Sequence, residues 1–223
     1  MAKEAVEDES EFYSKAERYW KAVPATVDGM LGGYGHISSL DIASSRAFLL
    51  RFLKEGPNRT GTSRALDCGA GIGRISKRLL LPLFREVDLV DVTEGFLDQA
   101  RDFLGEEARR VRNYFCCGLQ DFSPEPGAYD LIWIQWVIGH LTDDHLAAFL
   151  KRCRQGLRPN GLIVIKDNMA QEGVVLDDVD SSVCRGLEVV LGIVRRAGLR
   201  LLAQEQQQGF PDEIYHVYTL AMR

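Results

Sequence analysis

The stretch Asp67-Cys68-Gly69-Ala70-Gly71-Ile72-Gly73 decides how this chain is interpreted. It follows the apolar pair Ala65-Leu66 and precedes an amphipathic segment, residues 75–83, which predicts a turn from a strand into a helix. Glycines at alternate positions let the backbone adopt dihedrals closed to other residues and approach a ligand. A dinucleotide-binding fingerprint has the spacing Gly-x-Gly-x-x-Gly, and here Arg74 stands in place of its third glycine. The turn predicts either a cofactor site of another kind or a tight connection without a ligand.

A second acidic residue favours the cofactor interpretation. Residues 86–91 are typical of a strand, and Asp91 ends it, 24 residues after Asp67. An acid at the end of the next strand is placed to bind ribose hydroxyls. The alternatives are that Asp91 caps the following helix and that Asp67 is a solvated strand end. Together with the glycines, the two acids indicate a cofactor site.

Composition excludes several classes of protein. With 223 residues, 46% of them hydrophobic, the chain can bury one substantial core. The net charge of −5 argues against a nucleic-acid binder with a basic face and suits a basic peptide or a neutral small molecule. The five cysteines lack a repeated pair spacing, so we expect free thiols and no metal site. The acidic start, residues 1–11, and the lack of any 18-residue apolar window predict a soluble intracellular protein without a signal peptide.

Apolar, strand-like runs alternate with amphipathic helices along the chain. Strands are expected near residues 64–67, 86–91, 111–116, 129–135, 161–167, 199–205 and 214–221, and helices near 9–22, 41–55, 73–81, 94–104, 143–156 and 183–197. This alternation predicts an α/β fold whose mostly parallel sheet has helices on both faces, with an antiparallel edge from the last two strands. Glycine-rich residues 26–35 and residues 168–182 are expected to be irregular. We expect a single domain over residues 1–223, with an N-terminal helical extension and lid loop (1–56) packed on a core (57–223).

Four segments are expected to meet where the strands end, which is where ligands bind in such sheets. The first two are the glycine turn and Asp91 with Thr93. After the third strand, Leu119 and Gln120 are placed to meet the face and edge of an adenine, the alternative being a simple polar loop. After the fourth, Gln135 lies within reach of another part of the cofactor.

Other side chains could serve the substrate. His140 has an unperturbed pKa near 6.5 that suits proton transfer, unless it only caps the next helix. Asn168 offers an acceptor oxygen to an amine, unless it is an ordinary turn residue. The acidic cluster 177–180 could attract a cation or be a solvated face. Trp20 and Trp136 either wall a groove suited to proline rings and cations or belong to the core.

Several segments together resemble the eukaryotic protein N-terminal methyltransferase family. The glycine turn has the spacing of the first motif of S-adenosylmethionine (SAM) methyltransferases, and the other similar segments are residues 28–35, 113–122, 133–141, 166–170 and 176–182. The resemblance covers nearly the whole chain except about the first ten residues. It implies a class I SAM-dependent methyltransferase with a Rossmann-like, seven-stranded sheet. The family methylates the α-amine of proteins that begin with Xaa-Pro-Lys or Xaa-Pro-Arg once the initiator methionine is lost.

The resemblance also implies a role for each matching residue. The cofactor SAM would be bound by Gly69, Arg74, Asp91, Thr93, Leu119, Gln120 and Gln135. The catalytic residues would be Asp180 and His140 as bases and Asn168 as the residue that holds the amine. The substrate would be bound by Trp20, Leu31, Trp136, Asp177, Asp180 and Tyr215, with Trp136 on the proline and the two acids near the third residue's cation. The partners would be protein substrates rather than nucleic acid or membrane, a monomer would suffice for catalysis, and the protein would occur in nucleus and cytoplasm.

Three rivals to this interpretation can be weighed from the residues. A small-molecule methyltransferase is disfavoured by the acidic cluster 177–180. A catalytically silent SAM-binding scaffold should lack the base and amine-holding residues, yet His140, Asn168 and Asp180 are present. An oxidoreductase is disfavoured by Arg74. The sequence leaves open how many methyl groups are added, the cellular substrates and the oligomeric state.

Overall fold

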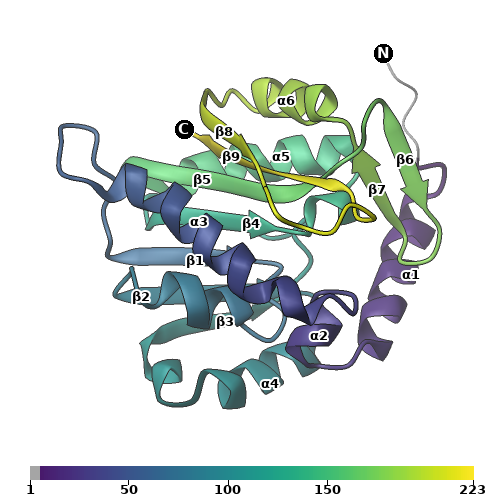
Figure 1. Ribbon diagram of the computed structural model, residues 1–223, viewed down its shortest axis with the longest axis horizontal. Coiled ribbons are helices and arrows are strands. Elements are labelled where there is room, and N and C mark those ends of the chain that lie inside the picture. The colour runs from purple at the N-terminus through teal and green to yellow at the C-terminus, as the bar shows by residue number, and fades with distance from the viewer. Residues whose placement is uncertain (1–5) are drawn as a thin grey trace.

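The computed structural model describes residues 6–223 and places one seven-stranded sheet at the centre of the molecule (Figure 1). The first residues of the acidic start, which entered the expectation of no signal peptide, lie outside this range. The strands, in the order in which they lie side by side, are β3 (Val111–Cys116), β2 (Glu86–Asp91), β1 (Arg64–Cys68), β4 (Tyr129–Gln135), β5 (Leu157–Met169), β9 (His216–Met222) and β8 (Leu201–Gln206).

The predicted fold class is confirmed. Strands β3, β2, β1, β4 and β5 pair in parallel, and β9 is antiparallel to both of its neighbours, β5 and β8. Every residue of β1 and β4 is buried, as continuous apolar runs predict for parallel strands covered on both faces. Strand β5 begins at Leu157, four residues earlier than expected, and its pairing with β4 shifts register after that point.

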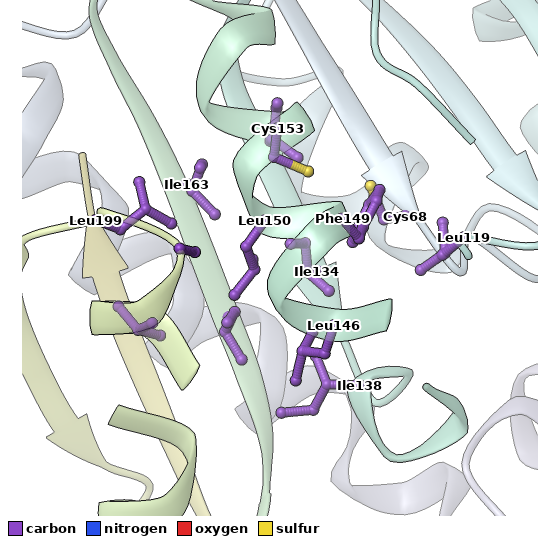
Figure 2. Close-up of a cluster of buried hydrophobic side chains, with 14 of the residues drawn as sticks. Cys68, Leu119, Ile134, Ile138, Leu146, Phe149, Leu150, Cys153, Ile163 and Leu199 are labelled. Carbon is purple, nitrogen blue, oxygen red and sulfur yellow. The ribbon is translucent and has the colours of Figure 1, made fainter. Parts of the chain in front are cut away.

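Alternate strand residues pack into two separate cores. On one face, Ala65, Leu131 and Trp133 pack with α3 (Ser38–Leu53), the π-helical turn η2 (Ser76–Leu80) and α4 (Glu94–Leu104). On the other face, Ile134 and Ile163 pack with α5 (Asp143–Gly156) and α6 (Leu187–Arg196). Figure 2 shows the α5 stripe Leu146, Phe149, Leu150 and Cys153 lying over this second face. Successive side chains of a strand point to opposite faces, so strands covered by helices on both faces have apolar residues at successive positions.

The N-terminal helices lie against the core as an extension. Helix α1 (Glu9–Ala22) begins where Asp8 accepts a hydrogen bond from the Glu11 amide at 3.0 Å, as an N-cap does. In Figure 1 it stands beside the small hairpin of β6 (Val174–Asp177) and β7 (Ser182–Arg185), and the Ser181 hydroxyl donates to the Phe12 carbonyl at 2.8 Å. Within residues 6–223, no helix is both long and apolar enough to cross a membrane.

Local structure departs from expectation in three places. Residues 168–182 were expected to be a loop and 183–197 a helix, but residues 174–185 form the β6–β7 hairpin and α6 starts only at Leu187. Cross-strand pairing fixes this hairpin, and such pairing is a tertiary contact with little local signal. The glycine-rich segment contains the short helix α2 (Val27–Met30), capped by Thr26, and the 3₁₀ turn η1 (Gly35–Ile37). The remaining 3₁₀ turns are η3 (Gly105–Arg110) and η4 (Ile138–His140).

Candidate functional site

Two cavities open at the carboxyl ends of the central strands. The first, called here the cofactor cavity, is lined by all seven residues assigned to the cofactor: Gly69, Arg74, Asp91, Thr93, Leu119, Gln120 and Gln135. The second, the substrate groove, has a volume of ≈ 460 Å³ and is lined by all eight residues assigned to catalysis or substrate: Trp20, Leu31, Trp136, His140, Asn168, Asp177, Asp180 and Tyr215. The two cavities share Trp20, Met30, Trp136 and His140. These four residues are called here the shared wall, and a group transferred from one cavity to the other would pass beside them.

At two positions of the glycine turn, both the backbone conformation and the surrounding space require glycine. Gly69 has φ +68°, and a Cβ on it would lie 2.8 Å from the Val137 side chain. Gly71 has φ +55°, and a Cβ there would lie 2.5 Å from the Met30 sulfur. Positive φ disfavours other residues, and both clashes would close the space that now forms the cavity floor. The turn therefore places its backbone at the cavity, where a bound ligand could approach it.

The two acids next to the turn have different surroundings. Asp67 is buried, and its Oδ2 accepts hydrogen bonds from the Ser76 amide and hydroxyl at 3.1 and 2.7 Å. It is not the solvated strand end that was considered, and burial raises its pKa to about 6. Asp91 accepts from the amides of Gly71 and Thr93, both at 2.8 Å. Burial raises its pKa although these hydrogen bonds act in the opposite direction.

The remaining walls of the cofactor cavity are partly fixed by internal contacts. Leu119 is buried and belongs to the hydrophobic core drawn in Figure 2. The Gln120 side chain folds back over Gly118, since a Cβ on that glycine would lie 2.5 Å from its amide. The Gln135 amide donates to both Asp41 oxygens at 2.9 and 3.0 Å and accepts from Trp133 at 2.8 Å. Gln135 thus lines the cavity and also holds Asp41 of α3 beside it.

Polar groups that line the cofactor cavity fit a molecule with hydroxyls and an anionic end. The Thr93 Oγ1 is buried without a hydrogen-bond partner among the described residues. Each Asp91 oxygen accepts one amide and keeps a lone pair for a hydroxyl. The Arg74 guanidinium reaches the cavity wall with its Nη1 bonded to Ser38 and Asp41. A hydroxyl-bearing ribose and an anionic end would satisfy these groups.

The substrate groove has an aromatic wall and an acidic side. Trp136 is held at φ +50°, and its indole N–H donates to Asn168 Oδ1 at 3.1 Å, so this contact fixes the orientation of the Asn168 amide. A positive φ at an aromatic residue is strained, and such strain is concentrated at functional sites. Asp177 and Asp180 also line the groove, and the Ser182 hydroxyl donates to Asp180 Oδ1 at 2.6 Å. This arrangement suits a flat ring next to a cation.

His140 has both ring nitrogens engaged. The Trp20 indole N–H, which can only donate, lies 2.9 Å from Nε2, and the Ser181 carbonyl, which can only accept, lies 3.1 Å from Nδ1. These partners fix the neutral imidazole with its proton on Nδ1. Burial lowers the His140 pKa, while the Asp180 charge acts to raise it. His140 lies at the shared wall, as expected, but in this arrangement neither nitrogen is free to take a proton.

Sequence reasoning missed three residues of the site. Met30 reaches both cavities, and Glu213 adds a third acid to the groove beside Asp177 and Asp180. Asp41, which is completely buried behind Arg74, was counted only as part of an amphipathic helix. An aspartate at helical spacing from apolar residues is a sequence signal for a buried charge, and it could have been noticed for Asp41. The sequence contains no comparable signal for Met30 or Glu213.

Comparison with known proteins agrees with this geometry. A family model described as AdoMet dependent proline di-methyltransferase matches residues 8–223. N-terminal Xaa-Pro-Lys N-methyltransferase 1 is 77% identical in Ailuropoda melanoleuca and 75% identical in Homo sapiens, each over 223 residues and 100% of both chains. A solved SAM-dependent methyltransferase from Leishmania major superposes with a TM-score of 0.88 at 37% identity, covering 95% of this chain and 83% of that one.

Proposed function

The chain belongs to the AdoMet dependent proline di-methyltransferase family, and from this premise we propose that its groove binds protein N-termini that begin Xaa-Pro-Lys or Xaa-Pro-Arg and methylates their free α-amine. It is a SAM-dependent methyltransferase, and SAM is its cofactor. The observation that carries the proposal is the shared wall. Trp20, Met30, Trp136 and His140 border both the cofactor cavity and the groove, so an amine in the groove can meet a methyl held in the cavity.

The substrate's second and third residues match the aromatic and the acidic residues that line the groove. The Trp136 ring offers a flat face to a proline ring. Asp177, Asp180 and Glu213 supply negative charge for the cation of a lysine or arginine at the third position. Arg185 also lines the groove, but it is paired with Asp143 at 2.7 Å and bonded to two carbonyls, so its charge is already engaged.

The chain's own residues must hold the amine and remove its proton. When bound, SAM supplies an electrophilic methyl on a sulfonium centre. An α-amine has a pKa of about 7.7–8.0 and is mostly protonated at neutral pH, so a proton must leave before nitrogen can attack. The Asn168 oxygen accepts from Trp136 and has a second lone pair that can accept from the amine and keep it in line with the methyl.

We assign the proton to Asp180 rather than to His140. One Asp180 oxygen accepts from Ser182, and the other has no hydrogen-bond donor among residues 6–223, so it can take a proton directly or through water. His140 has both nitrogens bonded and holds the Trp20 indole and the hairpin turn at Ser181 in place. In this mechanism Asp180 is the base and His140 is a positioning residue.

Peptide selectivity tests the proposal. With SAM, a peptide beginning Ser-Pro-Lys should gain methyl groups by mass spectrometry, and an N-acetylated copy of it should gain none. Replacing the proline by alanine should remove most turnover, and replacing the lysine by glutamate should slow turnover more than replacing it by glutamine. Equal methylation of the acetylated and free peptides would contradict the proposal, and equal rates for the lysine and glutamate peptides would contradict the role of the acids.

The same experiment counts the methyl groups, of which we expect one, two or three. We propose that the protein occurs in the nucleus and the cytoplasm, and fractionating cells that express it would test this.

A further inference from the structure

A cluster of buried charges lies behind the cofactor cavity. The Asp41 carboxylate pairs with Lys166 Nζ at 2.7 Å and with Arg74 Nη1 at 2.8 Å. The side chains of Asp41 and Lys166 are 0% exposed and that of Arg74 is 6% exposed. Buried charges are costly unless they are paired, and one carboxylate cannot neutralise two cations. The cluster therefore keeps one positive charge in excess.

No other acid in the described chain balances this charge by direct contact. Asp67 is close to Arg74 but binds Ser76 and forms no ion pair with the guanidinium. Asp167 accepts from the amides of Val137, Ile138 and Asn168. Glu205 is half-exposed and pairs with Arg51 at 3.1 Å.

The two cations of the cluster differ in what they face. Lys166 Nζ is surrounded by protein acceptors, namely Asp41 Oδ1, Ser45 Oγ at 2.9 Å and Gln207 Oε1 at 2.8 Å, and it does not line the cofactor cavity. Arg74 does line the cavity, and its Nε and Nη2 form no hydrogen bond with residues 6–223. The excess charge is thus presented to the cavity through Arg74.

We propose that Lys166 neutralises Asp41 so that Arg74 keeps the unpaired charge with which it receives the carboxylate of the cofactor's amino-acid portion. Without Lys166, Arg74 and Asp41 would form a neutral pair, which has no excess charge to attract a second carboxylate. Lys166 touches no ligand, so it acts as a positioning residue through charge. The inference rests on SAM binding by the family and is independent of the peptide substrate.

Two ligands that share an adenosine separate this role from a structural one. S-adenosylhomocysteine carries the amino-acid portion, and 5′-methylthioadenosine lacks it. By calorimetry, Lys166→Met should raise the Kd of S-adenosylhomocysteine at least about tenfold, the scale of a hydrogen bond to a charged group. The Kd of 5′-methylthioadenosine should stay within about twofold, which also shows that the adenosine site of the variant is folded.

A charge-balanced double variant provides the matched control. In the double variant Asp41→Asn with Lys166→Met, Arg74 is the single charged group of the cluster, so the cluster has the same net charge as in the wild type. This variant should recover most of the lost S-adenosylhomocysteine affinity. Asp41→Asn alone should keep the wild-type preference for S-adenosylhomocysteine. The proposal is overturned if Lys166→Met weakens both ligands equally or neither, or if the double variant binds S-adenosylhomocysteine less well than Lys166→Met. If Lys166→Met does not fold, the proposal is overturned when Asp41→Asn loses the wild-type preference for S-adenosylhomocysteine over 5′-methylthioadenosine.

Discussion

At the scale of single residues, His140 shows how neighbours decide a role that residue type leaves open. The ordinary pKa of histidine made it a candidate base. Burial lowers the His140 pKa, although the Ser181 carbonyl at Nδ1 and the charges of Asp180 and Asp177 act to raise it. The Trp20 N–H on Nε2 also opposes protonation, because that nitrogen must keep its lone pair to accept the hydrogen bond. Since the folded pKa lies below the unfolded value of 6.5, the unfolded chain binds the proton more readily. The stability contributed by His140 is therefore complete above pH 6.5 and is lost as the pH falls towards the folded pKa.

Trp20→Phe tests this assignment. The phenyl ring fills most of the indole's space but has no N–H, so Nε2 is released and this donor no longer opposes the charged form of His140. We expect the His140 pKa, followed by NMR of the ring protons, to rise relative to the wild type. Tyr13→Phe, on the same helix, removes a hydrogen bond to His145 instead and should leave the His140 pKa where it was. An unchanged pKa in Trp20→Phe would mean that the indole does not set the protonation of His140.

At the scale of elements, the β6–β7 hairpin turns an acidic stretch of sequence into one side of the groove. Asp177 and Ser182 are paired across the hairpin, and the turn between them holds Ser181 at φ +57°. Asp177 and Asp180 point into the groove, whereas Asp178, one residue from Asp177, does not line it. Three acids close in sequence therefore have different environments, and only two can contact a substrate cation.

A pair of charge-removing variants tests the hairpin. Asp177→Asn should raise KM for a Ser-Pro-Lys peptide by about three- to tenfold with little change in kcat, because it removes an attraction made equally before and during the reaction. Asp178→Asn changes the net charge by the same amount in the same hairpin but should leave KM near the wild-type value. If both variants raise KM equally, the acids act only as a diffuse field, and the effect should then disappear at high salt.

At the scale of the whole molecule, the cofactor cavity lies between the N-terminal extension and the sheet. Helix α1 lines it with Tyr13, Ala16, Glu17 and Trp20, and the glycine turn and strand ends line the rest. A ligand there is in contact with both parts at once. Ligand binding should therefore stabilise the extension and the core together.

Hydrogen exchange can measure this coupling. At free S-adenosylhomocysteine about 100 times its Kd, binding should add about 2.7 kcal/mol of stability and raise Tm by about 5–10 °C. Amides of α1 should exchange more slowly, as should those of the glycine turn. Helix α6 does not line either cavity and serves as the internal control, with a smaller change. Slower exchange in the turn without any change in α1 would show that the extension does not close on the cofactor.

The sequence by itself determined the sheet and the cofactor end of the site. Apolar runs broken by helical periods are local patterns, so β1, β2, β3 and β4 lie within one residue of the ranges expected from them. Glycine spacing and strand-end acids are equally local, because strand ends converge in any parallel sheet. The resemblance to a known family added the residues of the groove, and the structure brings all of them to its walls.

Only the tertiary structure decided the hairpin, the shared wall and the protonation of the site. The β6–β7 pairing, the contact of Met30 with Gly71 and the Trp20–His140 bond join segments distant in sequence or weak in local signal. The same holds for Asp41, whose two cations come from the glycine turn and from β5. Charge and hydrogen bonding depend on which groups meet after folding, so residue type alone could nominate His140 as a base but could not show that both its nitrogens are occupied.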